Sequence, residues 1–263
     1  MKLTLHEVAK VVGAKNSLSD IDDVPLRQAE FDSRKIEAGD LFVPLKGARD
    51  GHDFIETAFA NGAVATLSEK EIEGRPYLLV EDCLVAFQAL AHYYLDKLGV
   101  DVIAVTGSNG KTTTKDMIAA ILSTTYKTYK TQGNYNNEIG LPYTVLHMPK
   151  DTEKIVLEMG QDHMGDIELL SKIAKPHISV VTLIGEAHLE FFGSREKIAQ
   201  GKMQITDGMN SDGIVIVPDD PIIDAYLPEN MMVIRFGDEE EISVHNLQEK
   251  KDSLAFHTSI LRR

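Results

Sequence analysis

The pattern of apolar and polar residues divides the chain into two parts. In the first part, helical spacing predicts a short helix that opens with a capping box at Thr4 and ends at Gly13. Two more helices are expected over residues 54–60 and 82–98. Short strand-like runs stand between and beside them at residues 41–45, 63–67 and 77–80. We therefore expect residues 1–99 to form a small α/β domain.

The second part, residues 100–263, alternates strand-like runs with helical spacing. Its expected strands are apolar on both faces and lie at residues 102–105, 155–157, 178–183, 214–217 and 232–234. Strands of this kind are typical of a buried, mostly parallel sheet covered by helices. Residues 241–263 predict two further strands joined by a turn at 250–252. The predicted fold class is α/β in both parts.

Length and composition are those of a folded protein with about two domains. The 263 residues are 43% hydrophobic and 26% charged, which excludes a disordered or fibrous chain. Lys and Arg number 27 against 41 Asp and Glu, so the net charge is −14. Such a surface repels polyanions, and we expect neither nucleic acid nor an anionic membrane as a partner. A small anionic substrate is still compatible with this charge where a loop offers N–H groups, cations and a divalent metal.

The chain shows no signal for export or for membrane insertion. Its N-terminus lacks the apolar stretch of a signal peptide, and no window holds 18 uninterrupted apolar residues. Cys83 is the single cysteine, so it forms no internal disulfide, and its apolar neighbours predict a buried thiol. We expect a cytoplasmic protein.

A glycine-rich segment follows the expected strand that ends at Val105. It runs Thr-Gly-Ser-Asn-Gly-Lys-Thr over residues 106–112 and leads into a helical pattern. Glycines let backbone N–H groups converge on phosphate oxygens, while Lys111 reaches the outer phosphates and the Thr112 hydroxyl binds Mg²⁺. The first glycine is closer to the lysine than in the usual eight-residue pattern, and the alternative is a glycine-rich turn with a solvated lysine. The expected ATP-binding residues are Gly107, Ser108, Asn109, Gly110, Lys111, Thr112 and Thr113.

Together with other blocks, this loop resembles the Mur ligases, the ATP-dependent amide-forming family of bacterial peptidoglycan synthesis. The blocks that carry the resemblance are residues 31–54, 106–112, 133–142, 158–167 and 187–202. The Asn-Tyr-Asn-Asn-Glu-Ile-Gly run within 133–142 is similar to that of the type that adds D-alanyl-D-alanine to UDP-MurNAc-tripeptide. Alternatives are the diamino-acid-adding type and a non-catalytic nucleotide-binding regulator.

The resemblance implies a domain organisation and a reaction. It implies a substrate domain at 1–99 for the UDP-sugar and a central P-loop ATPase domain from 100, incomplete at residue 263. A further domain helps to bind the amine substrate in this family, so we expect the 263 residues alone to be inactive. The implied partners are ATP, UDP-MurNAc-tripeptide, D-Ala-D-Ala and two Mg²⁺ ions, with an acyl phosphate as intermediate.

Three residues in the second part are candidates for metal binding and catalysis beside Lys111. Glu158 follows the strand 155–157, where ligands of open α/β sheets bind, and its carboxylate suits Mg²⁺, although a capping or solvated acid is the alternative. For His188 the resemblance implies a metal ligand. Lys202 by itself predicts a solvated surface lysine. The resemblance implies instead that it reacts with CO₂ and that the carbamate helps to bind a second Mg²⁺.

Further candidates are implied for substrate binding. The resemblance places Ser33, Arg34, Asp50 and His52 in the UDP-sugar pocket, where the Arg34 guanidinium can pair with a phosphate. A turn with a surface ion pair is the alternative for these residues. Asn137 precedes an expected helix near residue 138, where asparagine is a common cap, and only the resemblance implies that it faces substrate. His163 is expected either beside the metal ligands or at the surface.

Overall fold

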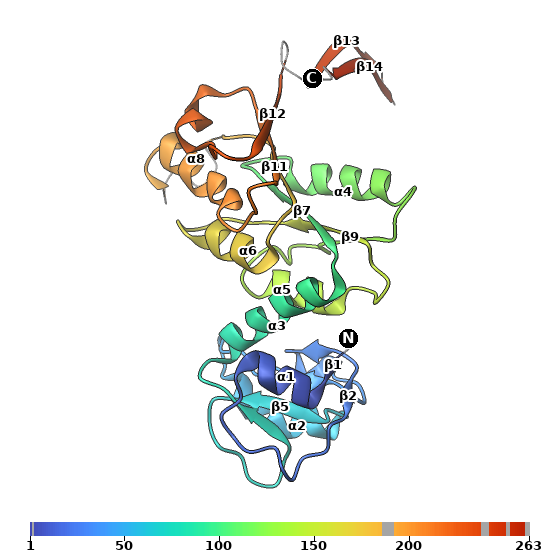
Figure 1. Ribbon diagram of the computed structural model, residues 1–263, viewed down its shortest axis with the longest axis vertical. Coiled ribbons are helices and arrows are strands. Elements are labelled where there is room, and N and C mark those ends of the chain that lie inside the picture. The colour runs from blue at the N-terminus through green and yellow to red at the C-terminus, as the bar shows by residue number, and fades with distance from the viewer. Residues whose placement is uncertain (2, 186–191, 238–241, 251–252, 261–263) are drawn as a thin grey trace. The chain divides into compact units, whose positions relative to one another are not determined.

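The structure is a computed structural model that describes residues 1, 3–185, 192–237, 242–250 and 253–260 (Figure 1). The chain forms two compact units. Unit 1 contains residues 1–100 and 132–153, and unit 2 contains residues 101–131 and 154 onward. The sequence predicted a single boundary at residue 99. It did not predict that segment 132–153 belongs to unit 1.

Unit 1 begins with a short strand, β1 (Leu3–Thr4), that pairs with β2 (Pro25–Leu26) and leads into helix α1 (Leu5–Val12). The Thr4 side chain accepts a hydrogen bond from the Glu7 backbone N–H, and Gly13 ends the helix in the left-handed conformation. The structure thus confirms both helix ends that the sequence predicts. The Glu7 carboxylate instead accepts hydrogen bonds from Tyr93 and Lys97, so it joins α1 to a helix far along the chain.

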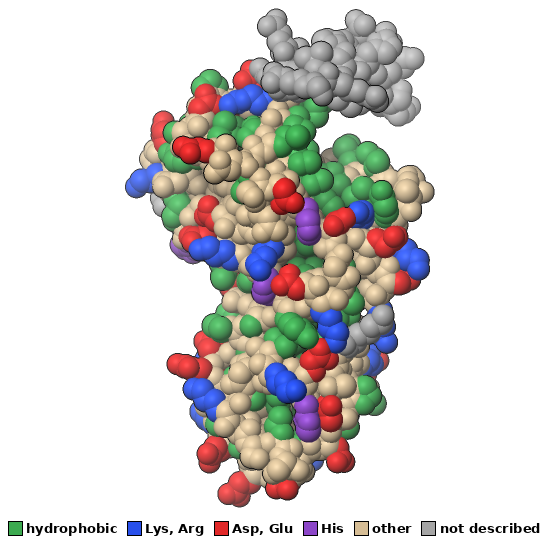
Figure 2. All heavy atoms as spheres, viewed as in Figure 1, with side chains coloured by type: hydrophobic (Ala, Val, Ile, Leu, Met, Phe, Trp, Pro, Cys, Tyr) green, Lys and Arg blue, Asp and Glu red, His purple; other side chains and the backbone are tan. Residues whose placement is uncertain are grey.

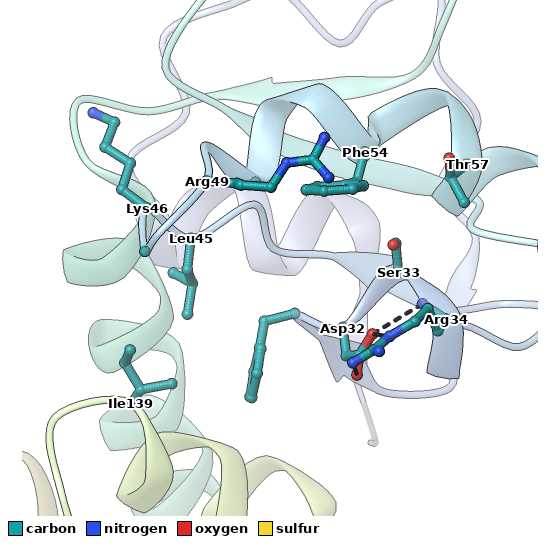
Figure 3. A pocket seen from close by; sticks show the side chains of 12 residues that line it. Asp32, Ser33, Arg34, Leu45, Lys46, Arg49, Phe54, Thr57 and Ile139 are labelled. Atoms are coloured by element: carbon teal, nitrogen blue, oxygen red, sulfur yellow. Dashed lines mark hydrogen bonds and ion pairs between the residues drawn. The ribbon is translucent and has the colours of Figure 1, made fainter.

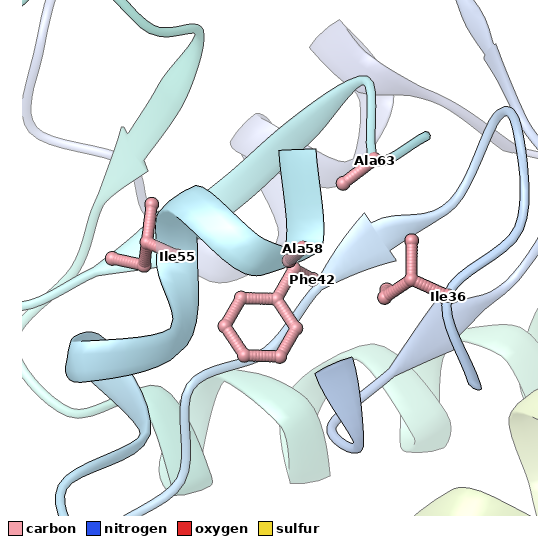
Figure 4. Close-up of a cluster of buried hydrophobic side chains, with 5 residues drawn as sticks. All are labelled: Ile36, Phe42, Ile55, Ala58 and Ala63. Atoms are coloured by element: carbon pink, nitrogen blue, oxygen red, sulfur yellow. The ribbon is translucent and has the colours of Figure 1, made fainter. Parts of the chain in front are cut away.

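A four-stranded parallel sheet forms the centre of unit 1. Its order is β3 (Ala29–Glu30), β4 (Leu41–Phe42), β5 (Ala65–Ser68) and β6 (Tyr77–Leu79). Short 3-10 turns η1 (Ser33–Lys35) and η2 (Gly51–Phe54) flank the connections, and η2 continues into α2 (Ile55–Ala60). The Phe42 ring packs in a buried cluster with Ile36, Ile55, Ala58 and Ala63 (Figure 4). Burial of such a ring contributes roughly 1.5–3 kcal/mol, and it fixes α2 on the sheet.

Helices α3 (Cys83–Leu98) and α5 (Gly140–His147) pack against each other and complete unit 1. The Asp82 carboxylate caps α3 by accepting from the N–H groups of Leu84 and Val85. The amide of Gln88 on α3 donates to the Glu138 carbonyl at 3.0 Å. This packing explains why segment 132–153 belongs to unit 1. Cys83 is buried, and burial raises the pKa of its thiol to about 12, so the expectation of a buried thiol is confirmed.

Unit 2 is built on a sheet whose strand order is β14-β13-β12-β11-β10-β7-β9-β8. The strands from β8 to β12 run parallel, and β13 and β14 form an antiparallel pair at the edge. Their bounds are β7 (Asp101–Thr106), β8 (Thr128–Lys130), β9 (Lys154–Glu158), β10 (Ile178–Val181), β11 (Ile214–Pro218), β12 (Met232–Phe236), β13 (Ile242–Lys250) and β14 (Ser253–Ile260). The predicted parallel α/β sheet is therefore confirmed.

Helices cover this sheet, with α4 (Lys111–Leu122) packed on β7, β8 and β9. Figure 1 shows α6 (Asp166–Ala174) and α8 (Arg195–Met203) on the other side of the sheet from α4. The 3-10 turns η3 (Gln204–Thr206) and η4 (Pro221–Tyr226) pack against α8. Because β7 lies between β9 and β10, the loops after these three strands meet at the carboxyl edge of the sheet.

The surface carries both signs of charge. Figure 2 shows acidic and basic side chains interspersed over the face in view. Among the described residues, every helix is too short or too polar to cross a lipid bilayer.

Candidate active site

The glycine-rich loop lies between the end of β7 at Thr106 and the start of α4 at Lys111. Gly107 has φ +150°, and a Cβ atom there would lie 1.9 Å from the Thr182 hydroxyl oxygen. Gly110 also has a positive φ, +80°, at the N-terminus of α4. Only glycine therefore fits the first bend of the loop, and the N-terminus of α4 faces the space that the loop encloses.

The loop is held by the segment that follows β10. The Ser108 N–H donates to the Leu183 carbonyl at 2.8 Å, and the Ser108 hydroxyl accepts from the Gly185 N–H at 2.9 Å. The Thr182 hydroxyl donates to the Asn109 carbonyl at 2.6 Å. These bonds fix the loop before any phosphate binds. The sequence analysis missed Thr182, although it lies at the end of an expected strand.

Lys111 lies at the first position of α4, and its Nζ donates to the Gly107 carbonyl at 2.9 Å. The ammonium is therefore folded over the loop rather than extended into solvent. The alternative of a solvated lysine is therefore not observed, and binding of phosphate by the loop stays a prediction.

Thr112 and Glu158 bring a hydroxyl and a carboxylate together at the edge of the sheet. The Thr112 hydroxyl donates to Glu158 Oε2 at 3.0 Å. Glu158 is 3% exposed, and its backbone N–H donates to the Thr131 hydroxyl at 3.0 Å. The ammonium of Lys115, also buried, lies 3.7 Å from Glu158 Oε2. A solvated acid is thus excluded for Glu158, and Lys115 is a residue that the sequence analysis missed although it follows Lys111 by one helical turn.

Lys202 is 3% exposed on α8, so it is not the solvated surface lysine that the helix pattern alone predicts. Its Nζ donates to Gln161 Oε1 at 3.2 Å. Burial, with a smaller effect from the positive charge of Lys111, lowers the pKa of Lys202 to about 8. The neutral amine is therefore more populated near neutral pH than it is for an exposed lysine. α8 itself is shorter than the expected helix of residues 194–209, because it passes into η3 at Gln204.

Two histidines complete the predicted set in unit 2. His188 lies outside the described residues. The His163 side chain is 77% exposed in the turn before α6, where its backbone N–H donates to Asp166, so the surface alternative is the one observed. Within the described ranges, no three His, Cys, Asp or Glu side chains form a cluster that could hold a metal ion.

Unit 1 holds a separate cavity of about 700 Å³ (Figure 3). Two of its lining residues, Ser33 and Arg34, were predicted, and Arg34 forms a two-pronged ion pair with Asp32 at 2.8 Å. The cavity also has a cation that the sequence analysis missed, since the Arg49 guanidinium lies 4.6 Å from the centre of the Phe54 ring. The remaining lining residues are Phe31, Asp32, Leu45, Lys46, Gly47, Gly51, Thr57 and Ile139.

Three other predicted substrate residues have protein partners. Asp50 Oδ1 lies 2.7 Å from His52 Nδ1, and His52 Nε2 accepts from the Glu69 N–H at 3.1 Å. Both ring nitrogens of His52 are thus occupied. The Asn137 side chain accepts from the Gly140 N–H at 2.8 Å, as a cap does. The cavity lining in Figure 3 contains none of the three, and their role in substrate binding stays a prediction.

Known proteins are similar to this chain in sequence and in fold. The UDP-N-acetylmuramoyl-tripeptide–D-alanyl-D-alanine ligase of Bacillus subtilis is 47% identical over 229 residues, which cover 85% of this chain and 50% of the relative. The crystal structure of MurF from Acinetobacter baumannii superposes with a TM-score of 0.92 at 31% identity, over 99% of this chain and 59% of that one. The MurF ligase of Thermotoga maritima in complex with ADP gives a TM-score of 0.83 at 36% identity, over 89% and 56%.

These relatives are longer than the chain, which spans about half the length of the curated relatives it matches. Residues 27–92 match the Mur ligase family, catalytic domain, and residues 105–262 match the Mur ligase middle domain. The second match covers more than half of the chain and includes the whole of the phosphate loop and the Glu158 and Lys202 segments. The chain therefore belongs to the Mur ligase family.

Proposed function

We propose that this protein is an ATP-dependent ligase of peptidoglycan precursor synthesis that adds D-Ala-D-Ala to UDP-MurNAc-tripeptide. The observation that carries the proposal is the meeting of Thr112, Glu158 and the phosphate loop at one sheet edge, with Thr112 Oγ1 3.0 Å from Glu158 Oε2. The name of the Bacillus subtilis relative supports this pair of substrates, and the ADP in the Thermotoga maritima neighbour supports the nucleotide. ATP and a UDP-linked sugar also make the cytoplasm the expected location.

The reaction requires that a carboxylate be activated before an amine attacks it. The terminal carboxylate of the tripeptide attacks the γ-phosphorus of ATP, the bond between the β- and γ-phosphates breaks, ADP leaves and an acyl phosphate forms. The amine of D-Ala-D-Ala then attacks the acyl carbon, loses a proton, and displaces phosphate through a tetrahedral intermediate. In this scheme, the loop N–H groups orient the phosphates. The Lys111 ammonium offsets the negative charge that shifts between oxygens while the phosphoryl group is transferred.

The residues at this edge fit Mg²⁺, since a hydroxyl and a buried carboxylate are oxygen ligands of the kind that this ion prefers. Thr112 and Glu158 would hold one ion, and the Lys202 carbamate with His188 would help to hold a second. When bound, Mg²⁺ neutralises charge on the transferring phosphoryl group. The burial of Lys202 and its lowered pKa, about 8, favour reaction of the neutral amine with CO₂.

The cavity in unit 1 is the proposed site for the UDP-sugar. Ser33 supplies a hydroxyl donor, and Arg34 can exchange its Asp32 partner for a phosphate. Lys46 and Arg49 add positive charge to the same cavity. We keep Asp50, His52 and Asn137 as further substrate contacts, acting either directly or by shaping the turns beside the cavity.

Release of phosphate with and without each co-substrate tests this function, measured on a longer polypeptide that spans the full length of the relatives, because the 263 residues alone are expected to be inactive. We expect release to require both UDP-MurNAc-tripeptide and D-Ala-D-Ala, and Lys111→Ala to abolish it while the fold is retained. The matched control is Lys197→Ala, because Lys197 is exposed on α8. Release with a diamino acid in place of D-Ala-D-Ala would indicate the diamino-acid-adding type. ATP binding without any ligation in the longer polypeptide would indicate a nucleotide-binding regulator.

A further inference from the structure

Gln161 lies in the turn after β9 and is 6% exposed. Its Oε1 accepts a hydrogen bond from Lys202 Nζ at 3.2 Å. Its Nε2 is buried and has no hydrogen-bond partner, which is found for only two other side-chain atoms of the described residues. A buried N–H group without an acceptor lowers the stability of the folded state by about 1–3 kcal/mol. The Gln161 amide can therefore donate a hydrogen bond to an acceptor that is not one of the protein's standard side chains.

Gly201 on α8 packs closely against the Nε2 end of the Gln161 amide. A Cβ atom at Gly201 would lie 1.8 Å from Gln161 Nε2 and 2.9 Å from its Cδ. A glycine inside a helix destabilises it by about 0.5–1 kcal/mol relative to alanine, and here it leaves room for the amide. The Gln161 side chain is therefore held beside the neighbouring residue, Lys202.

The two ends of the Gln161 amide match the two ends of a carbamate. A carbamate on Lys202 has one N–H group and two oxygens, whereas the amide has an oxygen acceptor and N–H donors in the same plane. Oε1 can keep the hydrogen bond that it already accepts from Nζ. Nε2 can donate to a carbamate oxygen and so gain the acceptor that it lacks.

We propose that Gln161 is a positioning residue that holds a carbamate on Lys202 through both ends of its amide. The inference rests on the proposed function, which assigns the carbamate. In the step itself, the Lys202 ammonium loses a proton, and the amine lone pair forms an N–C bond with CO₂. One C=O bonding pair moves to oxygen, and nitrogen releases a second proton, so that no oxidant or reductant is needed.

The test measures the carbamate directly by ¹³C NMR of the protein equilibrated with ¹³C-bicarbonate. The wild type is expected to give a carbamate signal that disappears in Lys202→Met. Gln161→Met keeps the length of the side chain and removes the donor, so it should lower carbamate occupancy about tenfold at subsaturating bicarbonate. Gln161→Glu, which offers acceptors and a negative charge but no donor, should lower it at least as much. Gln200→Met is the matched control, because Gln200 is exposed on the same helix.

The outcomes separate this inference from the function. A wild-type signal that is unchanged in both folded Gln161 variants would overturn the role of Gln161 and leave the ligase proposal intact. If Gln161→Met fails to fold by circular dichroism, Gln161→Glu decides alone, since it keeps the volume of the side chain. Absence of the signal from the wild type would also overturn the inference, while phosphate release with both co-substrates would report separately on the function.

Discussion

The hydroxyl of Thr112 donates to the Glu158 carboxylate at 3.0 Å, although 46 residues separate the two along the chain. Thr112 belongs to the first turn of α4 and Glu158 to the last position of β9. Since α4 packs on β9, the glycine-rich loop before α4 and the carboxylate at the end of β9 are held next to each other. The pair thus links the proposed nucleotide site to the proposed Mg²⁺ site.

Glu158→Gln is expected to weaken ATP binding in the presence of Mg²⁺ and to change it little in the absence of Mg²⁺. The amide keeps the size of the side chain but removes the charge that attracts the ion. We expect a loss of at least about tenfold in affinity, which corresponds to about 1.4 kcal/mol. Calorimetric titration with and without Mg²⁺ measures both values. Glu196→Gln, on an exposed part of α8, is the control, and an unchanged Mg²⁺ dependence in Glu158→Gln would contradict the assignment.

Gly107→Ala is expected to destabilise unit 2 and to weaken nucleotide binding. The new Cβ would meet the Thr182 hydroxyl at 1.9 Å and the Leu183 nitrogen at 3.1 Å, so the loop must move. Strain and overpacking of this kind cost about 1–3 kcal/mol. Gly99→Ala serves as the comparison, because φ is +61° there but no atom lies within 4 Å. Chemical denaturation and ATP titration should separate the two variants, and equal effects on ATP binding would argue against a rigid loop.

Glu30→Gln is expected to destabilise the protein by about 1–3 kcal/mol at pH 7. Glu30 is 3% exposed and accepts hydrogen bonds from the Asp32 N–H at 2.8 Å and the Tyr143 hydroxyl at 3.2 Å. His147 Nε2 lies 3.6 Å from the same carboxylate. The amide cannot replace a charged acceptor with several donors around it. Urea denaturation measures the loss, and Glu73→Gln, at an exposed position, is the control.

The stabilisation that the Glu30 carboxylate provides should also depend on pH. Burial alone would raise the pKa of Glu30, but the contacts with His147, the Asp32 N–H and Tyr143 hold it below its ordinary value of 4.5. A lowered pKa in the folded state means that the stabilisation is complete above pH 4.5 and is lost as the pH falls through the folded-state value. The difference between wild type and Glu30→Gln should therefore shrink as the pH falls below 4.5. A difference that grows on acidification below pH 4.5 would contradict this prediction.

Lys202→Met is expected to raise the thermal midpoint at pH 7 in buffer free of CO₂. The pKa of Lys202 falls from 10.5 to about 8, so protonation of the buried amine destabilises the folded state. That cost is complete below pH 8 and disappears as the pH rises to 10.5. The midpoints of the wild type and the variant should therefore converge between these values. Midpoints that stay equally far apart at both ends of the range would show that Lys202 does not titrate as expected.

Local sequence patterns were sufficient for the elements that carry the phosphate loop. Thr4 and Gly13 bound the first helix as predicted, since capping depends on residues only a few positions apart. The loop at 106–112 was predicted for the same reason, because a strand, glycines at a bend and a lysine at a helix start are all local features. The apolar, β-branched strands also predicted a parallel sheet, since both faces must be buried.

Features that depend on contacts between distant parts of the chain could not be predicted from the sequence and became visible only in the tertiary structure. The short strand β8 carries too few apolar residues to be predicted, and it is a strand because β9 pairs with it. The helix pattern around Lys202 predicts exposure, yet the side chain is buried and donates to Gln161, 41 positions away in the chain. The cavity of unit 1 likewise combines Ser33 with Ile139. Sequence alone predicted the glycine-rich loop and Glu158 as candidates for phosphate chemistry, whereas packing decided which side chains join them and which are withdrawn from water, because burial is set by segments that are far apart in the chain.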